Sequence, residues 1–188
     1  VVNAHALTSN ESRTLKALET FLATYKEVNP NDEIEVVNLY ETNFPEINKE
    51  MFSAWNKLGN GLAFNDLTEI EQFLVSSFNA STEQFLNADK VIVANPLWNL
   101  AVPTRLKAWV DTINVAGKTF KYTENGPVGL AGNKKVVHIQ SAGGVYNNQD
   151  FGSQFIKTAF NFIGVNEFAK ISIDGLDANP QEAENMLN

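Results

Sequence analysis

Apolar runs bounded by polar turns alternate along this chain with segments of helical periodicity. Leu15, Leu18 and Leu22 recur at spacings of three and four within residues 12–26, which places them on one face of a helix. Residues 90–94 are apolar at every central position, as expected for a parallel strand covered by helices on both sides. The same patterns predict strands at 1–3, 33–39, 135–140 and 170–173, and helices at 48–58, 68–87, 153–163, from Pro103 and from Asn179 onward.

Five strands that alternate with helices predict a doubly wound α/β fold, with residues 1–188 forming a single domain. Ligands of such open parallel sheets bind beyond the carboxyl ends of the strands. We therefore expect the loops at 4–11, 95–102 and 141–148 to form one pocket. These loops are rich in Asn, Gly, Ser and aromatic residues, which suits an uncharged planar ligand held by backbone groups. A glycine-rich stretch at 117–132 favours a hairpin.

The first loop leads directly into a helix and favours a phosphate site. A helix start offers unpaired N–H groups and a partial positive charge. The hydroxyl groups of Thr8, Ser9, Ser12 and Thr14 can add donors, and Arg13 adds a full charge. The alternative is that Thr8 or Ser9 only caps the helix. The residues by themselves leave both interpretations open.

The other two loops carry an exposed ring and a pair of glycines. Trp98 follows a strand and a proline, and either presents a flat surface to a ligand or belongs to the core. Gly143 and Gly144 either let the backbone approach a flat ligand, because no Cβ intervenes, or form an ordinary strand-to-helix turn. The functional interpretations gain weight because all three loops converge on one place.

Composition narrows the classes of function. The 188 residues include 14 Lys and Arg and 22 Asp and Glu, a net charge of −8 that disfavours nucleic acid and anionic membranes. The absence of Cys excludes disulfides and thiolate chemistry. His5 and His138 lie on different strands without a carboxylate cluster, so no metal site is expected. No secretion signal or apolar span is visible, which predicts a cytoplasmic protein, and we expect a few residues before Val1 and a last helix that continues past Asn188.

Four segments together resemble the FMN-dependent NADH-azoreductases, which belong to the flavodoxin-like NAD(P)H:quinone oxidoreductases. The segments are ANPLWNLAVP (94–103), LKAWVD (106–111), GKTFKYTENGP (117–127) and HIQSAGG (138–144). The resemblance covers nearly the whole chain and is strongest to members from Gram-positive bacteria, whose first loop carries a histidine. It implies a flavodoxin-like five-stranded parallel sheet of order 2-1-3-4-5 and a homodimer with FMN at the interface.

The resemblance also implies an activity and a set of contacts. NADH, or NADPH, would reduce FMN, and the reduced cofactor would then reduce a quinone or an azo dye in a ping-pong cycle. The phosphate contacts fall on His5, Ser12, Arg13 and Thr14. Substrate contacts fall on Tyr122 and on Phe162, which would reach the flavin of the partner subunit. The flavin-ring contacts fall on Leu97, Trp98, Asn99, Leu100, Ser141, Ala142, Gly143 and Gly144.

No catalytic side chain is expected, because the flavin itself carries the hydride chemistry. Two other functions remain open at this point. A flavodoxin-type electron carrier without its own NAD(P)H oxidase activity has the same size and acidity, and a flavin-free α/β binding module has the same pattern of elements. A substrate enclosure built from residues 117–132 favours the enzyme, because a carrier leaves its flavin edge open to partner proteins.

Overall fold

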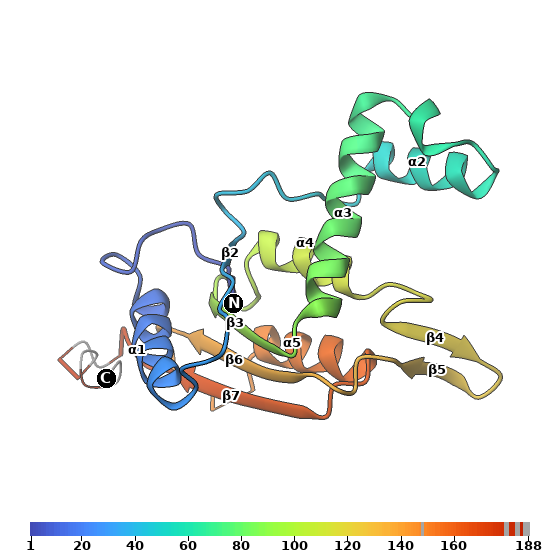
Figure 1. Ribbon diagram of the computed structural model, residues 1–188. Helices are drawn as coiled ribbons and strands as arrows, with labels where there is room; N and C mark the ends of the chain where they lie inside the picture. Colours follow the sequence, from blue (N-terminus) through green and yellow to red (C-terminus); the bar gives the residue numbers. More distant parts are fainter. Residues whose placement is uncertain (148, 179–180, 183–184, 186–188) are drawn as a thin grey trace.

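The structure is a computed structural model that describes residues 1–147, 149–178, 181–182 and 185. A parallel sheet of five strands in the order β2-β1-β3-β6-β7 forms its centre (Figure 1). The strands of this sheet are β1 Val2–Asn3, β2 Val37–Asn38, β3 Lys90–Pro96, β6 Lys135–Ser141 and β7 Glu167–Ile173. The expected order 2-1-3-4-5 is not the order in this numbering, because β4 (Phe120–Thr123) and β5 (Gly126–Gly129) pair separately as an antiparallel hairpin. A hairpin within 117–132 is thereby confirmed.

Five helices connect the strands, close to the positions that the apolar spacing predicts. They are α1 Arg13–Val28, α2 Lys49–Gly59, α3 Glu69–Asn87, α4 Thr104–Ile113 and α5 Phe151–Phe162, with a short 3-10 helix at Phe64–Asp66. Pro103 occupies the N-cap of α4 and not its first turn. The helix expected from Asn179 falls largely outside the described residues. Within the described part of the chain, no helix has the length and apolarity to span a membrane.

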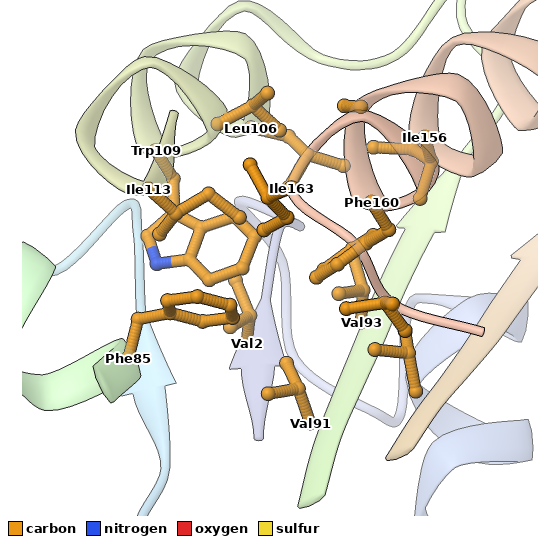
Figure 2. Packing of buried hydrophobic residues seen from close by; sticks show 14 of the residues in the cluster. Val2, Phe85, Val91, Val93, Leu106, Trp109, Ile113, Ile156, Phe160 and Ile163 are labelled. Carbon is orange, nitrogen blue, oxygen red and sulfur yellow. The ribbon is translucent and has the colours of Figure 1, made fainter. Parts of the chain in front are cut away.

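Helices cover both faces of the sheet, as the two-sided apolarity of β3 requires. Val91 and Val93 face the cluster formed with α3, α4 and α5, whereas Ile92 and Ala94 face α1. Figure 2 shows the larger cluster, in which Trp109 and Phe160 lie over the valines of the sheet. Their ring centroids are 6.2 Å apart. Each face of the sheet is therefore packed by its own set of side chains, and the polar carboxyl ends of the strands remain available to bind a ligand.

The strand predicted at 33–39 is wrong over most of its length. Only Val37 and Asn38 are paired, because β1 offers them Val2 and Asn3 as its two partners. Residues 33–36 have no neighbouring strand among the described residues, apart from one hydrogen bond from the terminal amine of Val1 to the carbonyl of Glu35. Local apolarity favours a strand here, but a segment becomes part of a sheet only where a neighbouring backbone pairs with it.

A third, smaller cluster supports an extension away from the sheet. Helix α2 and the first half of α3 project from the domain (Figure 1) and pack through Met51, Leu74 and Phe78. A capping box begins α3, in which Thr68 and Glu71 exchange hydrogen bonds. This extension is distant from the carboxyl ends of the sheet strands.

Candidate functional site

The carboxyl ends of β1, β3 and β6 bring the three predicted loops together. Residue Pro96 at the end of β3 is in register with Ser141 at the end of β6, and the N–H of Leu97 donates to the carbonyl of Ser141 over 2.8 Å. Between the first and second loops, the rings of His5 and Trp98 meet edge to face with centroids 5.3 Å apart. The three loops thus lie close together at one rim of the sheet, and the single pocket expected of them stays a prediction.

His5 lies at the start of the first loop and is 7% exposed. Burial lowers its pKa below the usual value, with the nearby carboxylate of Glu11 partly opposing this. Its Nδ1 accepts the N–H of Leu7 over 3.0 Å, so the neutral ring carries its proton on Nε2. The imidazole thus offers an N–H donor at the rim of the sheet.

The start of α1 provides further donors, although not in the way the sequence suggests. Ser12 is the N-cap, and its Oγ accepts the N–H of Leu15 over 3.3 Å, so the interpretation of Thr8 or Ser9 as the cap is wrong. The first N–H groups of the helix, on Arg13 and Thr14, have no acceptor within the helix. The side chain of Thr14 points inward, with its hydroxyl 2.6 Å from that of Ser141.

Arg13 has a partner that the sequence analysis did not identify. Its guanidinium donates to Asp177 over 2.7 Å, and both side chains are well exposed, at 44% and 76%. An exposed pair of this kind is worth little energetically, so an anion with more charge can replace the carboxylate. Asp177 lies 164 positions further along the chain and has no local pattern that marks it.

The second loop contains a strained turn. Trp98 and Ala101 exchange two backbone hydrogen bonds of 3.0 Å around Asn99 and Leu100. Both central residues have positive φ, 49° and 68°, as a type I′ turn requires. Asparagine tolerates this conformation, but leucine does not, at a cost of about 1–2 kcal/mol. Strain of this kind gathers where a loop holds a ligand.

The third loop is held by the segment that follows β7. The N–H groups of Gly175, Leu176 and Asp177 donate to the carbonyls of residues 142–144 over 2.9–3.2 Å. A Cβ on Gly143 would overlap Oδ2 of Asp177, whereas one on Gly144 would lie 3.1 Å from the ring of Tyr146. The space beside Gly143 is therefore needed by a neighbour in the chain itself.

Tyr122 and Phe162 do not join the three loops within this chain. They flank Phe120, whose ring centroid is 5.4 Å from that of Tyr122 and 4.6 Å from that of Phe162. Helix α5 begins near the carboxyl ends of the strands and ends near their amino ends, where the β4–β5 hairpin lies (Figure 1). The two residues form an exposed aromatic surface on the other side of the domain.

Tyr40 is a further rim residue that the sequence analysis did not select. Its ring centroid is 6.4 Å from that of Trp98 in an edge-to-face arrangement. Burial raises the pKa of its hydroxyl, and Arg105 partly opposes that rise. Its position directly after β2 could have suggested it, since the carboxyl end of each strand borders the same rim.

A cavity of about 1010 Å³ lies elsewhere, at the amino ends of the strands. Lys90, Val91 and Ile92 line it on one side and residues 31–35 on the other, and none of its lining residues belongs to the three loops. Its volume alone does not make it the functional site.

The donors and turns at the rim fit FMN. Its phosphate needs N–H, hydroxyl and cationic groups, which the start of α1 and His5 supply together. Its ring needs apolar surface and backbone donors, and the Leu97–Leu100 turn and the Ser141–Gly144 segment lie side by side at this rim. The strained Leu100 is the observation that fits a ligand better than it fits simple structural packing.

Comparison with known proteins identifies the class. The profile of the family with a flavodoxin-like fold matches residues 1–188, and the chain belongs to that family. An FMN-dependent NADH:quinone oxidoreductase of Bacillus cereus is 43% identical over 171 residues, which are 88% of this chain and 81% of that protein. Another from Streptococcus suis is 43% identical over 184 residues, covering 98% of this chain and 89% of that protein.

Solved structures agree with these relatives. An FMN-dependent NADH-azoreductase from Bacillus anthracis, solved in complex with FMN, matches with a TM-score of 0.91 and 34% identity over 99% of this chain and 91% of that one. An azoreductase from Bacillus anthracis matches with a TM-score of 0.89 and 36% identity over 99% and 90% of the two chains. The similarity to azoreductases inferred from the four sequence segments is confirmed.

Proposed function

We propose that this chain is an FMN-dependent NADH:quinone oxidoreductase that also reduces aromatic azo compounds. The observation that carries the proposal is the convergence of the three loops around a strained turn in a chain 43% identical to oxidoreductases named for this activity. We further propose that residues 1–188 form a single FMN-binding domain that acts in the cytoplasm as a homodimer.

The phosphate of FMN would bind at the start of α1. The Nε2–H of His5, the hydroxyl of Ser12 and the first helical N–H groups on Arg13 and Thr14 supply neutral donors. The guanidinium of Arg13 supplies the charge, and would exchange Asp177 for the more highly charged phosphate. On a chain with a net charge of −8, such local donors are needed to hold an anion.

The flavin ring would lie between the other two loops. FMN, when bound, supplies the hydride chemistry, taking a hydride from NADH or NADPH and giving it to the acceptor. The backbone of Asn99 and Leu100 orients one edge of the ring, and Leu97 and Trp98 provide apolar surface against it. Backbone N–H groups of Gly143 and Gly144 would stabilise negative charge on the other edge, next to Ser141 and Ala142, and the N–H of Ala142 itself donates to the carbonyl of Ile173.

Tyr122 and Phe162 support a dimeric site. Tyr122 belongs to β4 and Phe162 ends α5, and Figure 1 shows both elements away from the carboxyl ends of the sheet strands, so the two residues would contribute to a flavin site from a partner subunit. Their exposures of 73% and 39% leave aromatic surface for such an arrangement. Flat apolar walls select a substrate by its planarity, which suits quinones and azo dyes equally.

An anaerobic titration tests the proposal. FMN is added to the protein, excess flavin is removed, and NADH is added while the absorbance of the bound flavin is followed. We expect NADH alone to bleach the flavin, and a naphthoquinone or an azo dye to restore its colour. A flavin-loaded protein that ignores NADH and NADPH would support an electron carrier, and a chain that takes up no FMN would contradict the proposed site.

A further inference from the structure

Four buried polar side chains form a continuous chain directly beneath the rim loops. Nε2 of His138 on β6 lies 2.7 Å from Oδ1 of Asn95 on β3. Nδ2 of Asn95 lies 3.3 Å from Oε1 of Gln140, and Nε2 of Gln140 donates to Oδ1 of Asp150 over 2.9 Å. We call these four residues the amide relay. None of them is more than 3% exposed, so each hydrogen bond has no competition from water.

The hydrogen bonds of the amide relay can run in only one donor-to-acceptor sense, because the relay ends in a carboxylate. Burial alone would raise the pKa of Asp150, but hydrogen bonds from Ser153 and Gln140 and from the ammonium group of Lys170 outweigh it and hold the pKa well below the usual range. An ionised carboxylate only accepts hydrogen bonds. Gln140 must therefore turn its amide N–H₂ toward Asp150 and its carbonyl toward Asn95.

The orientation of the Gln140 amide also fixes the orientation of Asn95 and the tautomer of His138. Asn95 donates from Nδ2 to Gln140 and, over 2.9 Å, to the carbonyl of Pro96, so its Oδ1 faces His138. His138 must then carry its proton on Nε2, and its buried Nδ1 has no hydrogen-bond partner among the described residues. Burial lowers the pKa of this ring to about 3, with Lys170 adding to the effect and Asp150 partly opposing it, so the ring is neutral.

We propose that the amide relay positions the two loops that hold the flavin ring, and that Gln140 is its central positioning residue. Gln140 immediately precedes the Ser141–Gly144 loop, and Asn95 and Pro96 immediately precede the Leu97–Leu100 turn. One hydrogen bond between two amides therefore ties the bases of both loops. The inference rests on the proposed function, because it assigns the loops to the flavin.

The start of α5 packs against the same point. A Cβ on Gly152 would lie 2.8 Å from Cδ1 of Leu97 and 3.0 Å from Oε1 of Gln140. The helix therefore touches both the relay and the turn without room for a methyl group. Asp150 caps this helix by accepting the N–H of Ser153 over 2.6 Å, so the relay also sets where α5 begins.

Histidine NMR tests the orientation of the relay without any flavin. The chain has two histidines, so a His5→Gln variant assigns both ring signals. We expect His138 in the flavin-free protein to be neutral with its proton on Nε2 and to stay so at pH values well below the ordinary histidine pKa of about 6.5. A neutral His138 with its proton on Nδ1 would overturn the relay, because its Nε2 would then have to accept a hydrogen bond and Asn95 could not be oriented as described.

FMN affinity tests the positioning role. Gln140→Met keeps the volume and removes both amide hydrogen bonds, and we expect FMN to bind roughly tenfold more weakly and the absorbance band of the remaining bound flavin to shift. Thr112→Val is the matched control, since it removes a buried hydroxyl 2.7 Å from that of Ser81, between α3 and α4. Both variants lose stability, but only Gln140→Met should change the flavin.

A second variant covers the case in which Gln140→Met does not fold. Gly152→Ala deletes no hydrogen bond and suits a helix, yet its methyl group would press on Gln140 and Leu97. It should also weaken FMN binding. If Gln140→Met or Gly152→Ala folds and shows unchanged FMN affinity and flavin spectrum, the positioning role is overturned. The proposed function still stands in that case, provided that the unaltered chain binds FMN. If the unaltered chain takes up no FMN, the proposed function fails and the relay's role with it.

Discussion

Two buried carboxylates, Glu71 and Asp150, occupy similar places in two helices and differ in what they connect. Each lies at the start of a helix and pairs with a lysine, Lys57 at 2.7 Å and Lys170 at 3.1 Å. The partners of Glu71 belong to α2 and to the first turn of α3, so its hydrogen bonds join two neighbouring helices of the extension.

The partners of Asp150 reach much further. They lie on α5, β6 and β7, and through Gln140 they extend to β3 and the base of the second loop. Two similar buried ion pairs can therefore have different roles: one joins two neighbouring helices, and the other fixes the geometry of a site. Burial and pKa do not separate the two cases, but the elements that are joined do.

The largest expected effect comes from removing the charge of Asp150. Asp150→Asn leaves Lys170 without its partner and weakens the cap of α5, so we expect the free energy of unfolding to fall by about 3 kcal/mol. FMN affinity should fall at least about tenfold, since the relay loses its fixed acceptor. Urea unfolding and a flavin fluorescence titration measure the two effects.

Glu71→Gln is the matched control for that variant. It also separates a lysine from a buried carboxylate, and it should lower the urea midpoint while leaving FMN affinity unchanged. If both substitutions weaken FMN binding to the same extent, the contrast between the two carboxylates fails, and general loss of stability explains both.

A smaller effect should follow from adding one methyl group in the third loop. Gly143→Ala would place its Cβ against Asp177, and we expect a loss of stability of about 1–3 kcal/mol together with weaker FMN binding. Truncating the side chain of Asp177 should remove the steric overlap with the new methyl group. The same substitution in an Asp177→Ala background should cost clearly less, and equal losses in both backgrounds would show that Asp177 is not the obstacle.

Acidification should weaken the fold in two stages. His138 has its pKa lowered from 6.5 to about 3 in the folded chain, so the unfolded chain binds protons first and stability falls as the pH drops below about 6.5. Burial lowers the pKa of His5 and contributes in the same direction. Urea unfolding along a pH series measures the slope, and a stability that is constant between about pH 6.5 and 4.5 would contradict a buried, neutral His138.

The second stage belongs to the carboxylates. Hydrogen bonds from Lys57, Ser53 and Thr68 lower the pKa of Glu71 from 4.5 to about 2, so its contribution is present above about pH 4.5 and is lost as the pH falls toward 2. Glu71→Gln should flatten the slope in this lower range only. A slope that is the same with and without Glu71 would show that its ion pair contributes nothing to folding.

The smallest expected effect comes from relaxing the turn in the second loop. Leu100→Gly suits the positive φ of 68°, so we expect a gain in stability of about 1 kcal/mol. The same change removes a side chain expected to contact the ring, and FMN affinity should decrease. A variant that gains stability and binds FMN as before would show that the strain of Leu100 does not serve the flavin.

The sequence predicted the parts of the fold that depend on local periodicity. The spacing of Leu15, Leu18 and Leu22 located α1, and the uninterrupted apolar run at Val91–Ala94 identified a strand buried on both faces. The strand expected at 33–39 was wrong over most of its length because pairing depends on a neighbouring strand, about which periodicity within 33–39 carries no information.

The candidate site divides in the same way. The three loops follow from strand order alone, since the carboxyl ends of parallel strands share one rim. Asp177 and the amide relay could not be predicted, because most of their contacts join residues far apart in sequence; Asn95 and Gln140 are 45 positions apart. The unpaired Nδ1 of His138 could not be predicted either: its Nε2 has a partner in Asn95, but its Nδ1 has none among the described residues.

A crystal structure of the chain with FMN bound tests the central claim most directly. We expect the phosphate at the start of α1, within hydrogen-bond distance of Arg13 and of Nε2 of His5. We expect the ring against Leu97–Leu100 on one side and Gly143–Gly144 on the other. FMN bound in the cavity at the amino ends of the strands, or anywhere away from these loops, would contradict the account.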